Sequence, residues 1–166
     1  MKNFQVTDKD SGKSYWISRS MAVTCVVVGI EREDKRILVE RRGPGCPDNI
    51  GKLVCPCGYL DYDETLKEAA RREVYEETGV IINLWDLSII GINDLPTENR
   101  QNVTVRFMAK IPMIDLKIQL DTNTKDRGGE KDEVSEILLL SPDEVRNSDP
   151  NDWAFGHREL ILGAIK

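Results

Sequence analysis

Three glutamates, Glu73, Glu76 and Glu77, occupy positions i, i+3 and i+4 of one short segment. The segment, residues 65–78, reads TLKEAARREVYEET and is rich in residues with high helix propensity, and Gly79 follows it as a typical helix terminator. Side chains at this spacing are neighbours on a helix surface. The sequence therefore predicts a helix that holds three carboxylates together.

These carboxylates are expected on the apolar side of the helix. At about 100° per residue, the three glutamates fall among Leu66, Ala70 and Val74, whereas Arg71 and Arg72 point away. Buried, unpaired carboxylates are strongly destabilising, so a cation is needed to offset them. Oxygen ligands without histidine or thiolate suit Mg²⁺ or Mn²⁺. The alternative is that the glutamates pair with nearby lysines and arginines at a helix end.

The segments around this helix predict an α/β fold with a mixed β-sheet covered by helices. Residues 1–14 are polar without a clear period, so we expect a loose N-terminal leader there. Runs rich in β-branched or apolar residues predict strands at 21–30, 36–41, 87–93, 103–111 and 136–140. Further helices are expected after Ser141-Pro142 and over about 156–165.

The composition is typical of one folded domain without a basic surface. A length of 166 residues suits a single domain over 1–166. The formal net charge of −6 offers no general attraction for a polyanion, so we expect no nucleic acid polymer as a partner. Because the sequence has neither a secretory leader nor an apolar run of about 18 residues, we expect a cytoplasmic protein that binds no membrane.

Read with its flanks, the helix completes a longer pattern. It consists of Gly58, five residues, Glu64, seven residues, Arg72-Glu73-Val74, one residue, Glu76-Glu77, one residue and Gly79-Val80. This is the Nudix box, G-x5-E-x7-R-E-U-x-E-E-x-G-U with U aliphatic, and the chain resembles a Nudix hydrolase. The resemblance implies a Nudix-type α/β/α sandwich and metal-dependent hydrolysis of a pyrophosphate bond in a nucleoside diphosphate linked to another group.

The resemblance also implies roles for individual residues. The metal ligands would be Glu73, Glu76 and Glu77, joined by the backbone carbonyl of Gly58, and the cofactor would be Mg²⁺ or Mn²⁺. Arg72 would orient the glutamates, and Glu64 would hold the preceding loop to the helix by pairing with an arginine.

Other family positions are open to more than one assignment. The general base is Glu73 or Glu77 in the box, or Glu130 or Glu133 in the downstream loop DRGGEKDEVSE, which could equally be an acidic surface loop. Arg42 matches a position that often contacts phosphate in this family, against the alternative of an ordinary surface charge. The resemblance leaves open whether the chain forms a homodimer.

The substrate is suggested only by weaker signals. Pro96 falls 16 residues after Val80, a spacing that resembles the marker of ADP-ribose pyrophosphatases, although a proline is also typical of a turn such as NDLPTEN. We therefore expect ADP-ribose or a nucleoside diphosphate sugar. The alternatives are a nucleoside triphosphate, a dinucleoside polyphosphate, or a non-catalytic nucleotide sensor. The complete box, and a chain that ends at Lys166 without a DNA-binding domain, favour an enzyme.

The stretch KLVCPCGYLD raises a rival interpretation, a structural zinc site. Its ligands would be Cys46, Cys55, Cys57 and His157, but Cys-x-Cys is shorter than the usual hook of a zinc site. We expect reduced thiols, with Cys55 packed as a small apolar residue and Cys57 near the metal without binding it.

Overall fold

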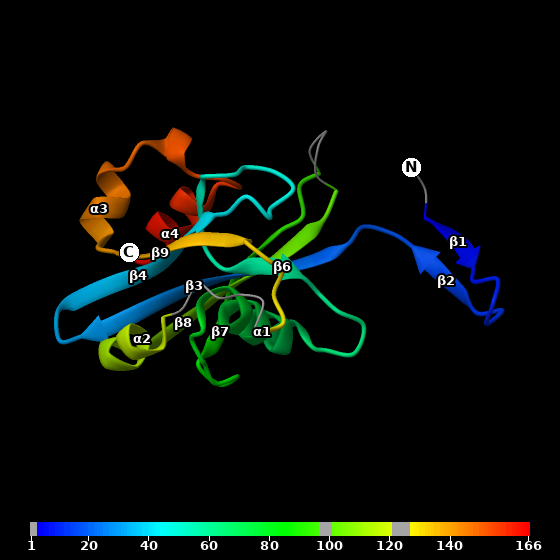
Figure 1. Cartoon of the computed structure of the whole chain (residues 1–166), viewed down its shortest axis with the longest axis horizontal. Coiled ribbons are helices and arrows are strands. Elements are labelled where there is room, and N and C mark those ends of the chain that lie inside the picture. The colour runs from blue at the N-terminus through cyan, green and yellow to red at the C-terminus, as the bar shows by residue number, and fades with distance from the viewer. Residues whose placement is uncertain (1–2, 97–100, 121–126) are drawn as a thin grey trace.

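The computed structural model describes residues 3–96, 101–120 and 127–166, and a mixed seven-stranded sheet forms its centre (Figure 1). The strands of this sheet are β3 (Met21–Glu31), β4 (Asp34–Arg42), β5 (Leu53–Val54), β6 (Cys57–Tyr59), β7 (Leu87–Asn93), β8 (Val103–Pro112) and β9 (Val134–Leu140). The main strand order is β5-β4-β3-β8-β7, and β6 and β9 pair with β3 and β4. Strands β3 and β8 are parallel, whereas the other pairs are antiparallel.

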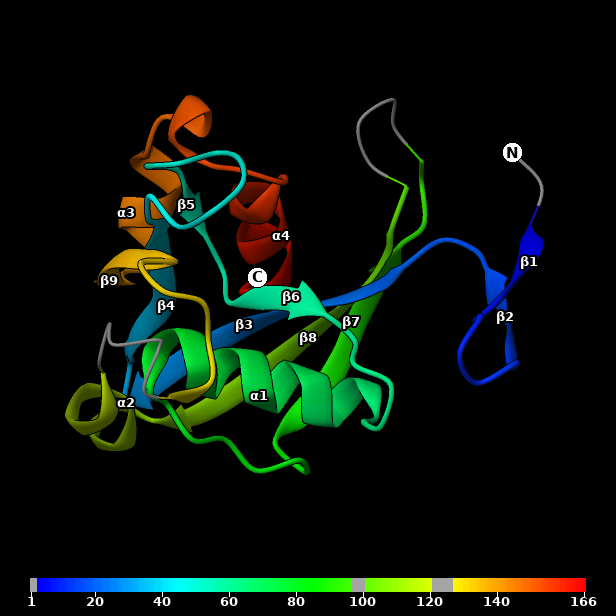
Figure 2. The ribbon, with the colours of Figure 1, turned by 45° about the vertical axis from the view of Figure 1, so that its right-hand side comes forward.

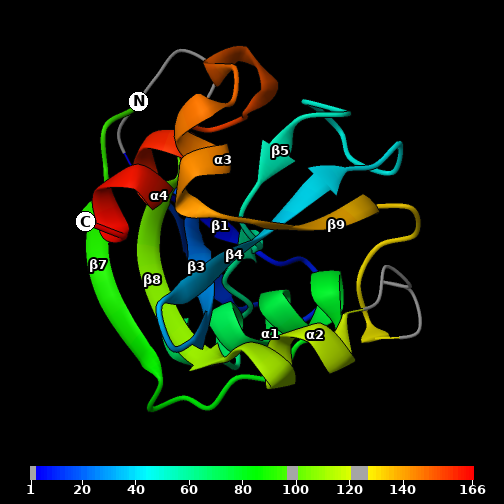
Figure 3. The ribbon, with the colours of Figure 1, turned by 90° about the vertical axis from the view of Figure 1, so that its left-hand side faces the viewer.

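Helices cover both faces of this sheet. They are α1 (Leu66–Thr78), α2 (Met113–Gln119), α3 (Pro142–Asn147) and α4 (His157–Ala164), with a 3₁₀ turn at Pro150–Asp152. Figures 2 and 3 show α1 and α2 on one side of the sheet and α3 and α4 on the other. The predicted α/β/α sandwich with a mixed sheet is confirmed. No helix in the described part of the chain is long and apolar enough to cross a membrane.

The strand β3 is apolar on both faces because each face meets a helical layer. Val23 and Val27 pack with α1 and α2 in one apolar cluster, whereas Val26 and Val28 pack with α3 and α4 in a second cluster. This arrangement explains why the run MAVTCVVVGI lacks polar alternation. It also makes the sheet a rigid support for whatever α1 presents.

The helix α1 has defined caps at both ends. The hydroxyl of Thr65 accepts the N–H of Glu68, and the Glu68 carboxylate accepts the N–H of Thr65 in return. At the other end Gly79 adopts a left-handed conformation with φ 79°, and its N–H donates to the carbonyl of Tyr75. The caps set the first and last residue of the helix, and the packing of Ala69, Ala70 and Val74 turns one face of it towards the sheet.

Three features of the fold differ from the expectations. Residues 1–14 are not a loose leader throughout, because β1 (Phe4–Thr7) pairs with β2 (Ser14–Ile17) in a hairpin beyond the end of the main sheet (Figure 1). The short strands β5 and β6 and the helix α2 were not expected from the sequence. Elements this short carry too few residues to show a period of their own.

The N-cap of α1 yields a stability prediction. Replacing the hydroxyl in Thr65→Ala leaves an N–H of the first turn without its partner, which should lower the free energy of unfolding by about 1 kcal/mol in urea. The control is Thr65→Ser, which keeps the hydroxyl and should stay close to wild type. Equal losses in both variants would show that the cap is not the cause.

Candidate active site

Two of the three box glutamates are buried between α1 and the sheet. Glu77 is 1% exposed and Glu73 9% exposed, and Glu76 is partly buried beside them. They lie on the side of α1 that also buries Ala70 and Val74, as the helical wheel predicts. The fold therefore brings carboxylates into an apolar layer, where they need compensation.

Arg72 supplies part of that compensation, and its side chain does not point away as the helical wheel predicts. It was expected to point away, but its long side chain folds back across the helix and is half-buried. Its guanidinium donates to Glu73 Oε1 at 2.7 Å and to Glu76 Oε2 at 2.9 Å. It also donates to both oxygens of Glu64 at 2.7 and 3.0 Å and to the carbonyl of Tyr59. The guanidinium of Arg72 thus joins α1 to the loop before it.

Gly58 lies against the carboxylate of Glu73. A Cβ atom built at Gly58 would collide with both oxygens and the carboxyl carbon of Glu73. Only glycine lets the β6 backbone approach this carboxylate so closely. The structure therefore brings together Gly58 and Glu73, two residues that the sequence analysis assigned to one site.

A further carboxylate, Glu40 on β4, was missed by the sequence analysis. It is 1% exposed and lies on the same face of β4 as Leu38, which packs in the apolar cluster of α1. Glu40 Oε2 and Glu77 Oε1 are both buried without a hydrogen-bond partner. The other oxygen of Glu77 accepts the N–H of Cys57 at 2.8 Å. A charged residue two positions from Leu38 in a buried strand was the available signal.

Burial changes the acidity of this cluster, which comprises Glu40, Glu73, Glu77 and Glu133. Desolvation, with Glu133 nearby, raises the pKa of Glu40 to about 8. Desolvation also raises the pKa of Glu73 to about 7, although Arg72 opposes the shift. Desolvation and the charge of Glu40 raise the pKa of Glu77 well above its ordinary value, and burial raises that of Glu133. The negative charge of the ionised cluster would exceed the positive charge that the surrounding residues provide.

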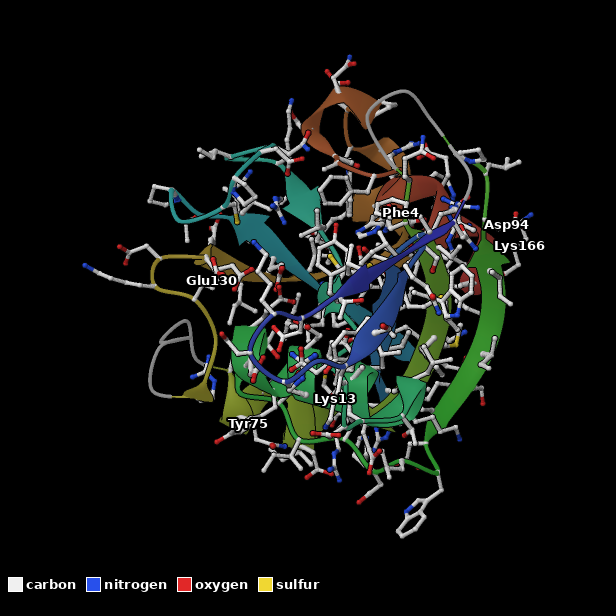
Figure 4. The ribbon with its side chains drawn as sticks, turned by 90° about the vertical axis from the view of Figure 1, so that its right-hand side faces the viewer. Phe4, Lys13, Tyr75, Asp94, Glu130 and Lys166 are labelled. Atoms are coloured by element: carbon white, nitrogen blue, oxygen red, sulfur yellow. The ribbon has the colours of Figure 1, made fainter. Side chains whose placement is uncertain are left out.

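The two downstream candidates occupy different environments. Glu133 is half-buried, and its carbonyl accepts the N–H of Gly43 at 2.6 Å and the thiol of Cys46 at 3.2 Å. Glu130 is exposed on the loop that runs beside α1 (Figure 4). The contacts of Gly43 dock the β9 end of this loop next to the cluster. The structure therefore brings Glu133, and not Glu130, towards the buried carboxylates.

Arg42 is a buried residue and not an ordinary surface charge. It is 8% exposed, and its guanidinium donates to the carbonyl of Asp48 at 3.0 Å and to Asp48 Oδ1 at 3.2 Å. The same guanidinium lies over the ring of Phe155, 5.1 Å from its centroid. Phe155 has a left-handed backbone with φ 61°. The C-terminal segment WAFGH thereby reaches the loop that follows β4.

The cysteines do not assemble as a zinc site. The Nδ1 atom of His157 accepts the backbone N–H of Cys55 at 3.0 Å, and the Cys55 side chain is buried in an apolar cluster. Desolvation and the charge of Glu77 raise the pKa of the Cys57 thiol well above its ordinary value, so it is un-ionised at neutral pH. Across the described ranges, no group of three or more His, Cys, Asp or Glu side chains is arranged, as it stands, to hold a metal ion.

A surface hollow beside α1 is lined by none of the four clustered glutamates. Arg72 and Glu64 help to line a hollow of about 530 Å³, together with Asp63, Glu68, Arg71, Tyr75 and Ile81. Glu40 and Glu77 do not line it. Arg72 therefore lies between this open side and the buried carboxylates. Pro96 lies far along the chain in an exposed segment after β7, and residues 97–99 of its turn are outside the described residues.

Comparisons with known proteins bear on the family and the fold of the chain. Residues 20–162 match the family model described as the NUDIX domain. A MutT-like protein from Streptomyces ambofaciens is 42% identical over 69 residues, covering 42% of this chain and 40% of that protein. An ADP-ribose pyrophosphatase from Methanocaldococcus jannaschii is 25% identical over 100 residues, covering 58% of this chain and 54% of that protein. The matches span about half the length of these relatives.

Solved structures share the fold at low sequence identity. A MutT/nudix family protein from Enterococcus faecalis has a TM-score of 0.69 and 19% identity, over 90% of this chain and 62% of that one. The NUDIX domain of Shewanella oneidensis NrtR, solved with ADP ribose, has a TM-score of 0.66 and 20% identity, over 89% and 87%. A Francisella tularensis NMN adenylyltransferase/ADP ribose pyrophosphatase, solved with AMP and a Mn ion, has a TM-score of 0.66 and 16% identity, over 89% and 41%.

The raised pKa values predict how the stability of the metal-free protein depends on pH. The pKa values of Glu40 and Glu73 in the folded protein are about 8 and about 7, above the ordinary value of 4.5. The folded state therefore binds more protons than the unfolded state in this range, and the free energy of unfolding should fall as the pH rises from 4.5 towards 8. Urea unfolding in the presence of EDTA measures it.

The matched variant for this prediction is Glu40→Gln. Because it removes one of the glutamates with a raised pKa, its free energy of unfolding should decline less steeply over the same pH range. A wild-type stability that stays level or increases with pH would contradict the prediction.

Proposed function

The chain belongs to the NUDIX domain family, and from this premise we propose that it is a pyrophosphohydrolase acting on a nucleoside diphosphate linked to another group. The observation that carries the proposal is the buried cluster of Glu40, Glu73 and Glu77, in which two carboxylate oxygens have no partner. A cluster of this kind suits an enzyme that brings a cation and a phosphate together, because the cation reverses the local field.

The chemistry of the donors present fits a hard divalent cation, and their side chains would move closer together to bind it. Two buried carboxylate oxygens lack partners, all the donors are oxygens, and Gly58 leaves room for the Glu73 carboxylate. We assign Mg²⁺ or Mn²⁺ to Glu73, Glu76 and Glu77, with the backbone carbonyl of Gly58. When bound, the cation would lower the pKa of a water molecule and neutralise phosphate oxygens.

The chain's own residues would perform the remaining tasks. Arg72 holds Glu73 and Glu76 through paired hydrogen bonds, which keeps their carboxylates at one place. Its contacts with Glu64 tie this group to the loop that runs from β6 to α1. Arg42 is assigned to a phosphate group of the substrate; its contacts with Asp48 and Phe155 would hold its guanidinium in position.

We assign the general base to Glu133. It is half-buried, and burial raises its pKa, which suits a group that accepts a proton near neutral pH. Its backbone is held by Gly43, so its position is defined. Glu130 is exposed on the same loop and serves as the natural comparison.

ADP-ribose is the proposed substrate, supported by the names of several related proteins. One curated relative is an ADP-ribose pyrophosphatase, and the NUDIX domain of NrtR was solved with ADP ribose. The MutT-like relative keeps nucleoside triphosphates among the alternatives, with nucleoside diphosphate sugars and dinucleoside polyphosphates.

A nucleotide sensor is the second candidate function. It is favoured by one observation, that Shewanella NrtR was solved with a 27mer DNA while its NUDIX domain was solved with ADP ribose. A sensor would bind ADP-ribose without turnover, which the next experiment separates from catalysis.

The enzyme proposal predicts release of AMP and ribose 5-phosphate from ADP-ribose in the presence of Mg²⁺ or Mn²⁺. Glu77→Gln should lower kcat by about 100-fold or more while the far-UV circular dichroism stays unchanged, because a metal ligand is lost. Glu33→Gln, in the exposed turn between β3 and β4, is the control and should keep full activity. Binding without hydrolysis across a nucleotide panel would support the sensor instead.

The general-base assignment predicts different effects for two neighbouring glutamates. Glu133→Gln should reduce kcat by about 100-fold or more with little change in KM, because the proton acceptor is lost. Glu130→Gln should have a small effect. A large loss in Glu130→Gln with a small loss in Glu133→Gln would assign the base to Glu130. Small losses in both variants would indicate that a glutamate of the Nudix box is the base.

A further inference from the structure

Glu40 is buried, and the charge of Arg42 offsets only part of its desolvation, so that its pKa stays raised. It lies in the middle of the sheet, because β4 pairs with β5 at Val54 and with β9 at Ile137 on either side of it. Its backbone is therefore held on both edges, and its side chain is on the α1 face with Leu38. A carboxylate here is far more costly than the apolar residue that such a position normally carries.

The nearby arginines are engaged with other groups. Arg72 contacts Glu64, Glu73 and Glu76, and none of its ion pairs involves Glu40. Arg42, two residues along β4, pairs with Asp48. In the described part of the chain, no ion pair links a lysine or arginine to Glu40 or to Glu77. The oxygens Glu40 Oε2 and Glu77 Oε1 remain without partners in this same layer.

We propose that Glu40 is an additional carboxylate ligand of the divalent cation that the box glutamates bind. The inference rests on the proposed function, and it extends the site from the helix α1 to the sheet. Two buried oxygens from two different elements, both lacking protein partners, are the arrangement that a shared cation would satisfy. The cation would then link β4 to α1, so it would also stabilise the fold.

The rival explanation is that Glu40 and Glu77 share one proton and bind no cation between them. The two explanations differ in their response to Glu40→Gln. An amide can donate a hydrogen bond to Glu77 and so replace a shared proton, but it is a much weaker ligand for Mg²⁺ or Mn²⁺ than a carboxylate.

The experiment measures Mn²⁺ binding directly, by titration of the purified chain with detection of free Mn²⁺ by electron paramagnetic resonance. Thermal unfolding in EDTA and in Mn²⁺ is recorded in parallel, so no substrate or activity is needed. The variants are Glu40→Gln, Glu77→Gln as the positive control and Glu33→Gln as the matched exposed control. We expect Glu40→Gln to weaken Mn²⁺ binding by about 10-fold or more and to reduce the increase in Tm that Mn²⁺ causes.

Each outcome has a defined meaning. If Glu77→Gln weakens Mn²⁺ binding and Glu40→Gln leaves it within about twofold of wild type, the role of Glu40 is overturned while the proposed metal site stands. If wild type binds no Mn²⁺, the proposed function and this inference both fail. Should Glu40→Gln not fold, Glu40→Asp replaces it. That variant keeps the charge but shortens the reach by one methylene, and unchanged Mn²⁺ affinity would overturn the role.

Discussion

The excess of negative charge between α1 and the sheet is the constraint on which the rest of the site depends. Glu40, Glu73 and Glu77 lie in a layer that is otherwise apolar, and Arg72 compensates only the outer part of the group. Carboxylates in such a place raise one another's pKa values and are destabilising unless a cation or protons neutralise them. Favourable packing elsewhere in the structure must therefore offset the destabilisation that this cluster causes.

That support comes from the layers on either side of the sheet. Two apolar clusters, one per face, anchor β3 and β4 and leave little freedom in the position of α1. The caps at Thr65 and Gly79 determine the helix bounds, and the buried Ala70 and Val74 turn the side that carries the glutamates towards the sheet. A shift of α1 by one residue would rotate its side chains by about 100° and move the carboxylates out of the layer.

The segments around the cluster are joined by contacts between residues that are distant in sequence. Cys57 donates its N–H to Glu77, and Cys55 donates its N–H to His157, so the CPC stretch contributes backbone donors and not thiolate ligands. Phe155 lies against Arg42, which connects the C-terminal segment to the loop after β4. The two cysteines thus have different neighbours: one faces the carboxylates, and the other packs with the helices of the opposite face.

The sequence by itself determined the local features: the helix over 65–78 with its terminator, the strands near 21–30 and 103–111, and the set of box glutamates. These depend on propensity, spacing and capping among residues close in the chain. The tertiary structure decided what a wheel or a motif could not: the return of Arg72 to the carboxylates, the burial of Arg42, and the interaction of Glu40 with Glu77. Such pairings arise because the packing of the sheet against α1 brings together residues that are far apart in the chain. A local sequence pattern does not show which of these residues meet in space.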